Sequence, residues 1–201
     1  MLPLVVPPGK SPNRAGRDRL WSMTSVNDDP ACDVAHGAVT DATPGRVLVA
    51  VFASPVAEFL LRYGRDAGYQ PVLVEPDPER AKIVKAPEEF DDSIAVEDSV
   101  RSYPDGPADV VVTDHHRPEL GPVLRDALVS DARWVGVMGN PRHPAPHIPA
   151  LAELGVAPEE IARVHRPIGL NIGSRTPAEI AISTIAGLIA ERNGRPGGFQ
   201  F

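Results

Sequence analysis

Short apolar runs that alternate with helix-like segments constrain the fold of this 201-residue chain more than any other feature. The runs at 46–52 (RVLVAVF) and 109–113 (DVVVT) are rich in β-branched residues and show no alternation of polar and apolar positions. Continuous runs of this kind are typical of strands buried on both faces of a parallel sheet. Between them, residues 56–67 carry apolar side chains at helical spacing and end near Gly68, which favours a helix end there.

The same alternation continues along the chain. We expect further strands at 72–75, 93–96 and 134–138, and further helices at 118–130, 150–154, 158–162 and 178–192. Strands that alternate with helices fold into a parallel sheet covered on both faces. The sequence therefore predicts an α/β fold with a Rossmann-like, doubly wound and mainly parallel sheet.

Three segments of different character divide the chain. Residues 1–44 are dominated by Pro, Ser, Asn, Asp and Gly without periodicity, which predicts a disordered tail. The Rossmann-like domain is expected over 45–194, and 195–201 is expected to be a flexible tail. Translation could begin at Met1 or at Met23, and the sequence leaves this open.

Charge and cysteine content exclude several classes of partner. The formal net charge of −7 argues against nucleic acid and anionic membranes, which both require a basic surface. No apolar run approaches the ~20 residues of a membrane span. The single cysteine, Cys32, excludes an internal disulfide and a thiolate metal cage. We expect a cytoplasmic protein.

Residues 167–182 (PIGLNIGSRTPAEIAI) combine a glycine loop with a helix start. Gly169 and Gly173 allow a tight turn, and Arg175 places a cation at its end. Thr176 is the expected N-cap, with Glu179 closing a capping box. Because a helix N-terminus favours anions, this loop is a candidate anion site; the alternative is that it only turns the chain into its last helix.

The loop after the first strand lacks the glycines of a dinucleotide fold. Ser54 lies where GxGxxG would stand, and Pro55 has no N–H to offer a pyrophosphate. Glu75, at the end of the second strand, is placed to bind a ribose or to be an ordinary exposed carboxylate. NAD or NADP is therefore an alternative cofactor for this crevice.

The strands at 109–113 and 134–138 end in polar groups. Thr113, His115 and His116 follow the first of them, and histidine suits a polar ligand contact at neutral pH. Gly139, Asn140 and Arg142 follow the second and suit phosphate or carboxylate. We expect no metal site, because the histidines lack a third ligand at a suitable spacing. We expect no catalytic residue either, since Ser54 has no nucleophile elbow around it.

With these residues assembled, the chain resembles the Rossmann-like C-terminal domain of the xanthine dehydrogenase accessory family (XdhC/CoxI) over about residues 46–194. The most specific matching stretches are VVVTDHHRPEL (110–120), ALVSDARWVGVMGN (127–140), LAELGV (151–156) and HRPIGLNIGSRTPAEIAIS (165–183). The resemblance implies a molybdenum-cofactor chaperone that holds the cofactor during sulfuration and delivers it to a molybdenum hydroxylase. The implied ligand is a pterin (molybdopterin) with a terminal phosphate, or a nucleotide.

Several positions depart from the family pattern. Ala53-Ser54-Pro55 replaces a glycine-containing turn followed by His, and Thr113-Asp114-His115-His116 replaces Thr-His-Asp-His. Gly139-Asn140 replaces Gly-Ser, and Asn171 replaces an acid. We expect no room here for the N-terminal domain of full-length members, and Cys32 lies in the wrong context to replace the cysteine that is implicated in holding the cofactor. These changes allow a shortened, altered or lost binding function.

The leading hypothesis is a non-catalytic accessory protein whose crevice binds a phosphate-bearing pterin or nucleotide. Its expected partners are a molybdenum hydroxylase or a sulfurtransferase, and a homodimer is compatible with it. One alternative is an NAD(P)-dependent oxidoreductase with Glu75 on the ribose. The other is a degenerate Rossmann scaffold that acts through protein interaction alone. The predicted binding residues are Ser54, Glu75, Thr113, His115, His116, Gly139, Asn140, Arg142, Gly169, Asn171, Gly173 and Arg175.

Overall fold

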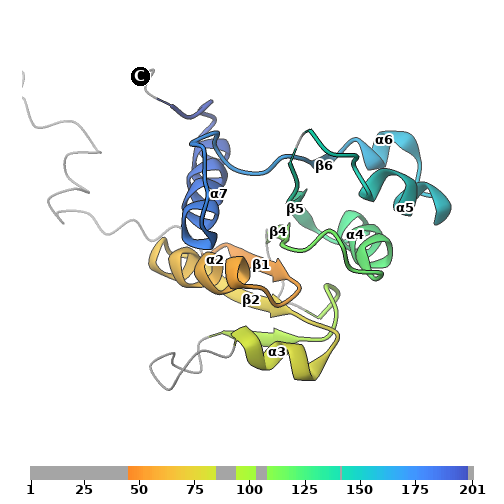
Figure 1. Ribbon diagram of the computed structural model, residues 1–201, viewed down its shortest axis with the longest axis horizontal. Helices are drawn as coiled ribbons and strands as arrows, with labels where there is room; N and C mark the ends of the chain where they lie inside the picture. The colour runs from red at the N-terminus through yellow and green to blue at the C-terminus, as the bar shows by residue number, and fades with distance from the viewer. Residues whose placement is uncertain (1–44, 85–93, 103–107, 141, 199–201) are drawn as a thin grey trace, which may run out of the picture. The chain divides into compact units, whose positions relative to one another are not determined.

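A computed structural model describes residues 45–84, 94–102, 108–140 and 142–198 (Figure 1). Six strands form one sheet in the order β3-β2-β1-β4-β5-β6, and every neighbouring pair is parallel. The strands are β1 (Val47–Val51), β2 (Gln70–Val74), β3 (Ala95–Glu97), β4 (Ala108–Val112), β5 (Ala132–Val137) and β6 (Val164–His165). This order is that of a doubly wound sheet, which confirms the predicted fold class.

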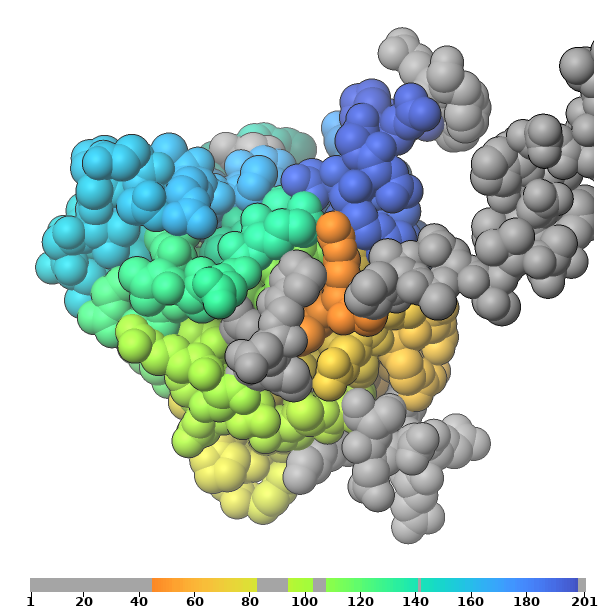
Figure 2. All heavy atoms as spheres, turned by 180° about the vertical axis from the view of Figure 1, so that it is seen from behind, coloured from red at the N-terminus to blue at the C-terminus, as the bar shows by residue number. Residues whose placement is uncertain are grey.

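Helices cover both faces of the sheet. Seen along β1, Leu48 and Ala50 point into one core with helices α2, α3 and α7, whereas Val49 and Val51 point into the other with α4, α5 and α6. The first group comprises α2 (Pro55–Asp66), α3 (Pro78–Val84) and α7 (Pro177–Arg192). The second comprises α4 (Leu120–Val129), α5 (His147–Glu153) and α6 (Pro158–Ile161), which form one continuous surface in Figure 2. Both faces of the central strands are therefore buried, as their continuous apolar runs predict.

Two long helices begin at the carboxyl edge of the sheet. Helix α2 follows β1 directly, with Ser54 as its N-cap. At the other end of α7, Glu191 pairs with Arg133 at the start of β5, so α7 also begins at the carboxyl edge. Figure 1 shows α2 and α7 packed beside each other on the same face. This edge is where ligands bind in sheets of this class.

Among the described elements, helix α3 and strand β6 were not predicted. Helix α3 begins at Pro78, which the sequence suggested would only close the preceding strand; proline is tolerated in the first helical turn, and the Asp77 carboxylate accepts the N–H of Glu79 at 2.9 Å. Strand β6 contains two residues, too few for a periodic pattern. The other predicted strands and helices are present, with ends shifted by up to a few residues.

Some predictions fall on other parts of the chain. The tail at 1–44 with Cys32, and residues 199–201, lie outside the described residues. Among the helices that the structure describes, none has the length and apolar character needed to span a bilayer.

Candidate functional site

Neighbouring strands bring the predicted residues together at the carboxyl edge. Strand β1 lies between β2 and β4, and β4 pairs with β5, so the loops after these four strands are adjacent. Ser54, Glu75, Thr113 and Gly139 each follow one of these strands within three residues. The carboxyl edge therefore has one half over β1 and β2 and another half over β4 and β5, which are the two halves of the expected crevice.

Ser54 and Thr113 form a hydrogen-bonded link between the β1 and β4 loops. The Ser54 hydroxyl donates to the Thr113 hydroxyl at 2.9 Å and accepts the N–H of Ala57 at 3.1 Å. The Thr113 hydroxyl lies 2.8 Å from the carbonyl oxygen of Phe52. Both side chains thus fix the backbone at the strand ends, and Ser54 also caps α2.

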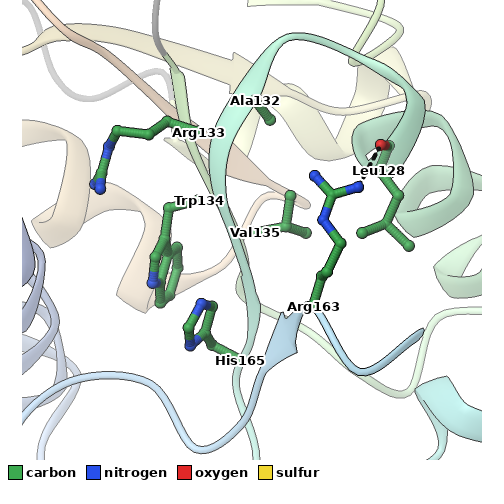
Figure 3. A pocket seen from close by; sticks show the side chains of 7 residues that line it. All are labelled: Leu128, Ala132, Arg133, Trp134, Val135, Arg163 and His165. Carbon is green, nitrogen blue, oxygen red and sulfur yellow. Dashed lines mark hydrogen bonds between the residues drawn. The ribbon is translucent and has the colours of Figure 1, made fainter. Parts of the chain in front are cut away.

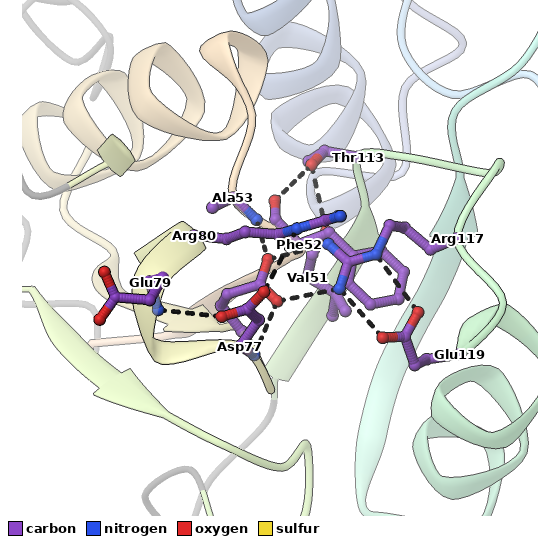
Figure 4. Close-up of polar contacts among 10 residues, drawn as sticks. Val51, Phe52, Ala53, Asp77, Glu79, Arg80, Thr113, Arg117 and Glu119 are labelled. Carbon is purple, nitrogen blue, oxygen red and sulfur yellow. Dashed lines mark hydrogen bonds and ion pairs between the residues drawn. The ribbon is translucent and has the colours of Figure 1, made fainter. Parts of the chain in front are cut away.

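Glu75 is buried and paired with an arginine that the sequence reasoning did not single out. Its side chain is fully buried and forms a two-pronged ion pair with Arg117, at 3.2 Å and 3.1 Å (Figure 4). The same carboxylate accepts the N–H groups of Ala53, at 2.8 Å, and Asp77, at 3.0 Å. Each Glu75 oxygen therefore accepts two hydrogen bonds. Glu75 is not the exposed carboxylate that one sequence interpretation expected.

Arg117 holds two acids at once. Its guanidinium also donates to both carboxylate oxygens of Glu119, at 3.2 Å and 3.1 Å, and lies 4.6 Å from the ring centroid of Phe52. Phe52 itself is fully buried and has φ of 71°, a left-handed conformation that is rare for bulky residues. One indication in the sequence could have located Arg117: an acid at the end of β2 needs a cation if it is buried.

His115 and His116 lie over β4 with their ring centroids 4.1 Å apart. His115 is half-buried, and its burial lowers the pKa of the imidazole below the ordinary value. The nearby charges of His116 and Arg166 lower that pKa further. His115 is therefore mainly neutral at pH 7, with ring nitrogens available to donate to or accept from a ligand.

Arg166, directly after β6, organises the loop after β5. Its guanidinium donates to the carbonyl oxygens of Asn140 at 2.8 Å, Pro144 at 3.1 Å and His143 at 3.3 Å. The side chain packs against Gly139, where a Cβ would collide with it. Gly139 thus allows this arginine to approach the loop. Arg166 is a second cation that sequence reasoning missed, although it lies within the HRPIGL motif.

A buried imidazole lies at the end of this loop, where helix α5 begins. His147 is 4% exposed, and its Nδ1 has no hydrogen-bond partner among the described residues; the Nε of Arg166 shares this state. Burial lowers the pKa of His147, and the charge of Arg166 adds to the effect. Helix α5 begins at His147, so His143 and His147 do not share a helical face, as Pro144 and Pro146 predicted.

The other predicted residues of this loop are exposed. The Asn140 side chain accepts the N–H of Arg142 at 2.9 Å, which closes a tight turn. The Arg142 side chain is exposed beside it. Arg142 is thus accessible to a ligand, whereas Asn140 supports the turn.

The glycine loop between β6 and α7 runs along α7 to the start of that helix. Gly169 has φ of 78° and lies so close to α7 that a Cβ would come within 2.8 Å of the Ser183 backbone. Asn171, Gly173 and Arg175 are exposed. The predicted capping box is present, and the Glu179 carboxylate accepts the N–H groups of Arg175 at 2.6 Å and Thr176 at 3.2 Å. An anion at this N-terminus would therefore meet a carboxylate.

Two hollows lie away from this edge, beside the short strand β6. They share Trp134 and His165, whose rings stack with centroids 4.9 Å apart (Figure 3). The larger one, about 240 Å³, lies between this stack and α7. None of the predicted residues except Gly169 lines either hollow.

The structure brings Ser54, Glu75 and Thr113 together in the β1–β2 half of the edge. It places His115, His116 and Gly139 in the β4–β5 half, near Arg166. Within the described part of the chain, no group of three His, Cys, Asp or Glu residues is arranged to hold a metal ion. The cations over β4 and β5 instead suit an anionic ligand.

Comparisons with known proteins agree with this architecture. The family model described as the XdhC Rossmann domain matches residues 48–188. A solved structure described as a xanthine dehydrogenase from Bacillus halodurans is similar over 82% of this chain and 52% of its own, with a TM-score of 0.59 and 22% identity. At that identity the likeness concerns the fold.

A curated relative is similar over a shorter stretch. The uncharacterized protein YqeB of Escherichia coli (strain K12) is 45% identical over 67 residues, which are 33% of this chain and 12% of YqeB. The chain thus spans about half the length of the solved relative and a small part of the curated one.

Proposed function

Because the chain belongs to the XdhC Rossmann-domain family, we propose that it is a non-catalytic accessory protein for molybdenum enzymes of the xanthine dehydrogenase type. Its crevice binds a phosphate-bearing pterin or nucleotide. The partner is a molybdenum hydroxylase or the sulfurtransferase that serves it.

The observation that carries the proposal is the charge of the crevice over β4 and β5. Arg166 is held there by three loop carbonyls, and Arg166, His116 and His143 all lie close enough to lower the pKa of His115. The acid among these neighbours is Asp114, which uses one oxygen to accept the N–H of His116 at 2.9 Å. Arg142 is exposed on the same loop, so arginine charges outnumber this carboxylate, which favours an anionic ligand.

The residues fit the terminal phosphate of molybdopterin. Arg142 is exposed beside the turn that Asn140 forms, and the buried Nδ1 of His147 and Nε of Arg166 lack partners among the described residues. Arg142 and Arg175 would neutralise the phosphate, and His115 would contact a polar edge of the pterin. The bound cofactor would supply the molybdenum centre that the client enzyme uses, while this chain would bind and orient it.

Thermal unfolding of the full chain tests the proposal. Molybdenum cofactor freshly released from a molybdenum hydroxylase, GMP and inorganic phosphate are each titrated while the melting temperature is recorded. A ligand at 100 times its Kd should stabilise the fold by about 2.7 kcal/mol. Arg175→Ala and Arg142→Ala should each weaken binding about tenfold with little change in the melting temperature of the free protein, because both side chains are exposed.

Arg163→Ala is the matched control. It removes the same charge just before β6, at the opposite edge of the sheet, and should leave ligand binding unchanged. If Arg175→Ala lowers the melting temperature of the free protein and leaves ligand affinity unchanged, Arg175 is not a ligand residue. An unchanged melting temperature with every pterin, nucleotide and phosphate would contradict ligand binding and favour the scaffold hypothesis.

A further inference from the structure

We propose that Arg117 is a specificity-determining residue that closes the β1–β2 half of the crevice to adenine dinucleotides. Paired with Glu75 and lying over Phe52, it occupies the half that a dinucleotide needs (Figure 4). The other half, over β4 and β5, takes a ligand with one terminal phosphate. This inference narrows the class of ligand that the proposed function allows. Only the statement about the half over β4 and β5 rests on that proposed function.

The acceptors that a ribose would need are already occupied. In doubly wound sheets, an acid at the end of the second strand accepts hydrogen bonds from the ribose hydroxyls. Glu75 has this position, but each of its oxygens already accepts one N–H from Arg117 and one from the backbone. A ribose would have to displace a buried, two-pronged ion pair, and breaking such a pair leaves a charge uncompensated.

A 2′-phosphate meets a similar obstacle. An arginine near this position can bind the phosphate of NADP. The Arg117 guanidinium, however, donates from Nη1 and Nη2 to Glu75 and from Nε and Nη2 to Glu119. These bonds neutralise its charge within the protein. The geometry therefore disfavours both forms of the nicotinamide dinucleotide.

The turn into α2 also offers few free N–H groups to a pyrophosphate. A dinucleotide's pyrophosphate accepts backbone N–H groups at the turn into the first helix. Here the N–H of Ala53 donates to Glu75 at 2.8 Å and that of Ala57 donates to Ser54 at 3.1 Å. Pro55, between them, has no N–H. The donors at these three positions are therefore already used or absent.

A bulky side chain also fills the space at this turn. Dinucleotide folds use glycine here because the phosphates approach the backbone closely. Phe52 adopts the left-handed conformation that such a turn requires, yet it carries a fully buried ring on which the Arg117 guanidinium rests. A strained bulky residue of this kind persists only where its surroundings fix it. Phe52 and Arg117 thus fill this end of the crevice together.

The test begins with the wild-type full chain. NAD, NADP and ADP-ribose are titrated by calorimetry and by thermal unfolding, with sulfate and GMP as ligands that carry no pyrophosphate. We expect no saturable binding of these three probes, each of which carries an adenosine pyrophosphate. Saturable binding of ADP-ribose or NAD to the wild-type protein would overturn the inference.

An opened variant provides the positive arm. Phe52→Gly with Arg117→Ser restores a glycine to the turn and frees Glu75, and should gain about tenfold or more in affinity for ADP-ribose. Phe52→Gly with Arg163→Ser changes the same residue types but leaves the ion pair of Arg117 with Glu75 intact. Its affinity for ADP-ribose should not rise. A folded opened variant with no gain contradicts the inference. If the double variant does not fold, Arg117→Ser alone replaces it, and if that also fails, the wild-type titration decides.

The two proposals fail in different ways. If the wild-type protein binds neither sulfate nor GMP nor molybdenum cofactor, the proposed function is wrong, while the behaviour of ADP-ribose still decides the role of Arg117. If ADP-ribose binds to the wild-type protein, the role of Arg117 is wrong, while cofactor binding that depends on Arg142 and Arg175 would still support the proposed function.

Discussion

Single residues at the carboxyl edge show both what the sequence predicts and what it conceals. The positions of Ser54, Glu75 and Thr113 follow from the ends of three buried strands, and the structure places them next to one another. Their hydrogen-bond partners do not follow from local patterns. Arg117 reaches Glu75 across 42 residues of chain, a pairing that depends on the strand order.

Arg166 was missed for a similar reason. In the sequence it is one of many charged residues that are usually exposed. In the structure β6 places it against the loop after β5, where three carbonyls accept its hydrogen bonds. The motif HRPIGL predicts an unusual local backbone and contains no information about the loop that it contacts. Side-chain partners across a sheet are therefore the part of the site that sequence reasoning lacks.

At the same scale, His147 should make stability depend on pH. Its pKa in the folded state is lowered by burial and by Arg166, so the neutral imidazole is favoured in the fold. The resulting stabilisation is present above the ordinary histidine pKa, about 6.5, and is lost as the pH falls below it. His147→Gln should flatten the fall in melting temperature between pH 7 and pH 5.

Exposed His143, on the same loop, provides the control. His143→Gln should leave the pH dependence of the melting temperature close to that of the wild-type protein. A wild-type slope retained in His147→Gln would show that another group titrates.

At the scale of elements, strands and helices with several buried residues could be predicted, whereas strand β6 and helix α3 could not. The five-residue strands β1 and β4 are continuous apolar runs, and α7 has both a capping box and a long apolar sequence. Strand β6 has two residues and owes its existence to pairing with β5. Helix α3 is short and contains Pro78, so its sequence resembles a turn.

The glycine loop before α7 contains two glycines with different roles. Gly169→Ala should lower the free energy of unfolding by about 3 kcal/mol, because it adds a left-handed strain and a Cβ that meets the α7 backbone at 2.8 Å. Gly173→Ala should cost only about 1 kcal/mol, since its φ of 71° is equally unfavourable but the surrounding space is open. Chemical denaturation of both variants measures the difference.

Each glycine is the control for the other, because the substitution and the backbone region are the same. Equal losses would show that the close packing of Gly169 against α7 contributes little. A larger loss at Gly173 would contradict the described path of the loop.

At the scale of the whole molecule, one sheet edge combines a neutral histidine with fixed cations. The Rossmann class and the position of this edge could be predicted from the alternation of strands and helices. The division of the edge could not be predicted: in one half Glu75 and Arg117 pair with each other, and in the other half Arg166 lies over β4 and β5. This division depends on which long side chains meet there. The domain's chemistry is therefore less apparent from its sequence than its architecture.

The protein should take up protons when it binds an anion at this edge. His115 has a lowered pKa in the free protein, and an anion bound beside it would favour the protonated imidazole. Because the neutral form dominates at high pH, affinity for sulfate should rise as the pH falls from 8 to 5.5. Asp114, His116, His143 and Arg166 face His115 and set the starting charge. Calorimetry over this pH range measures the effect.

His115→Gln should remove most of the rise in sulfate affinity. The control is His165→Gln, because the His165 imidazole lies on the edge strand β6, where it stacks on Trp134. An affinity that does not change with pH in the wild-type protein would separate His115 from the anion.

The attachment of Arg166 directly to β6 has a consequence for local opening. An edge strand of two residues that pairs only with β5 among the described strands belongs to the least protected part of a sheet. When β6 separates from β5, Arg166 leaves the carbonyls of the β5 loop, so each opening event also removes the principal cation of the crevice. A bound anion would resist that departure. Hydrogen exchange at the outermost strand and occupancy of the crevice would then report the same equilibrium.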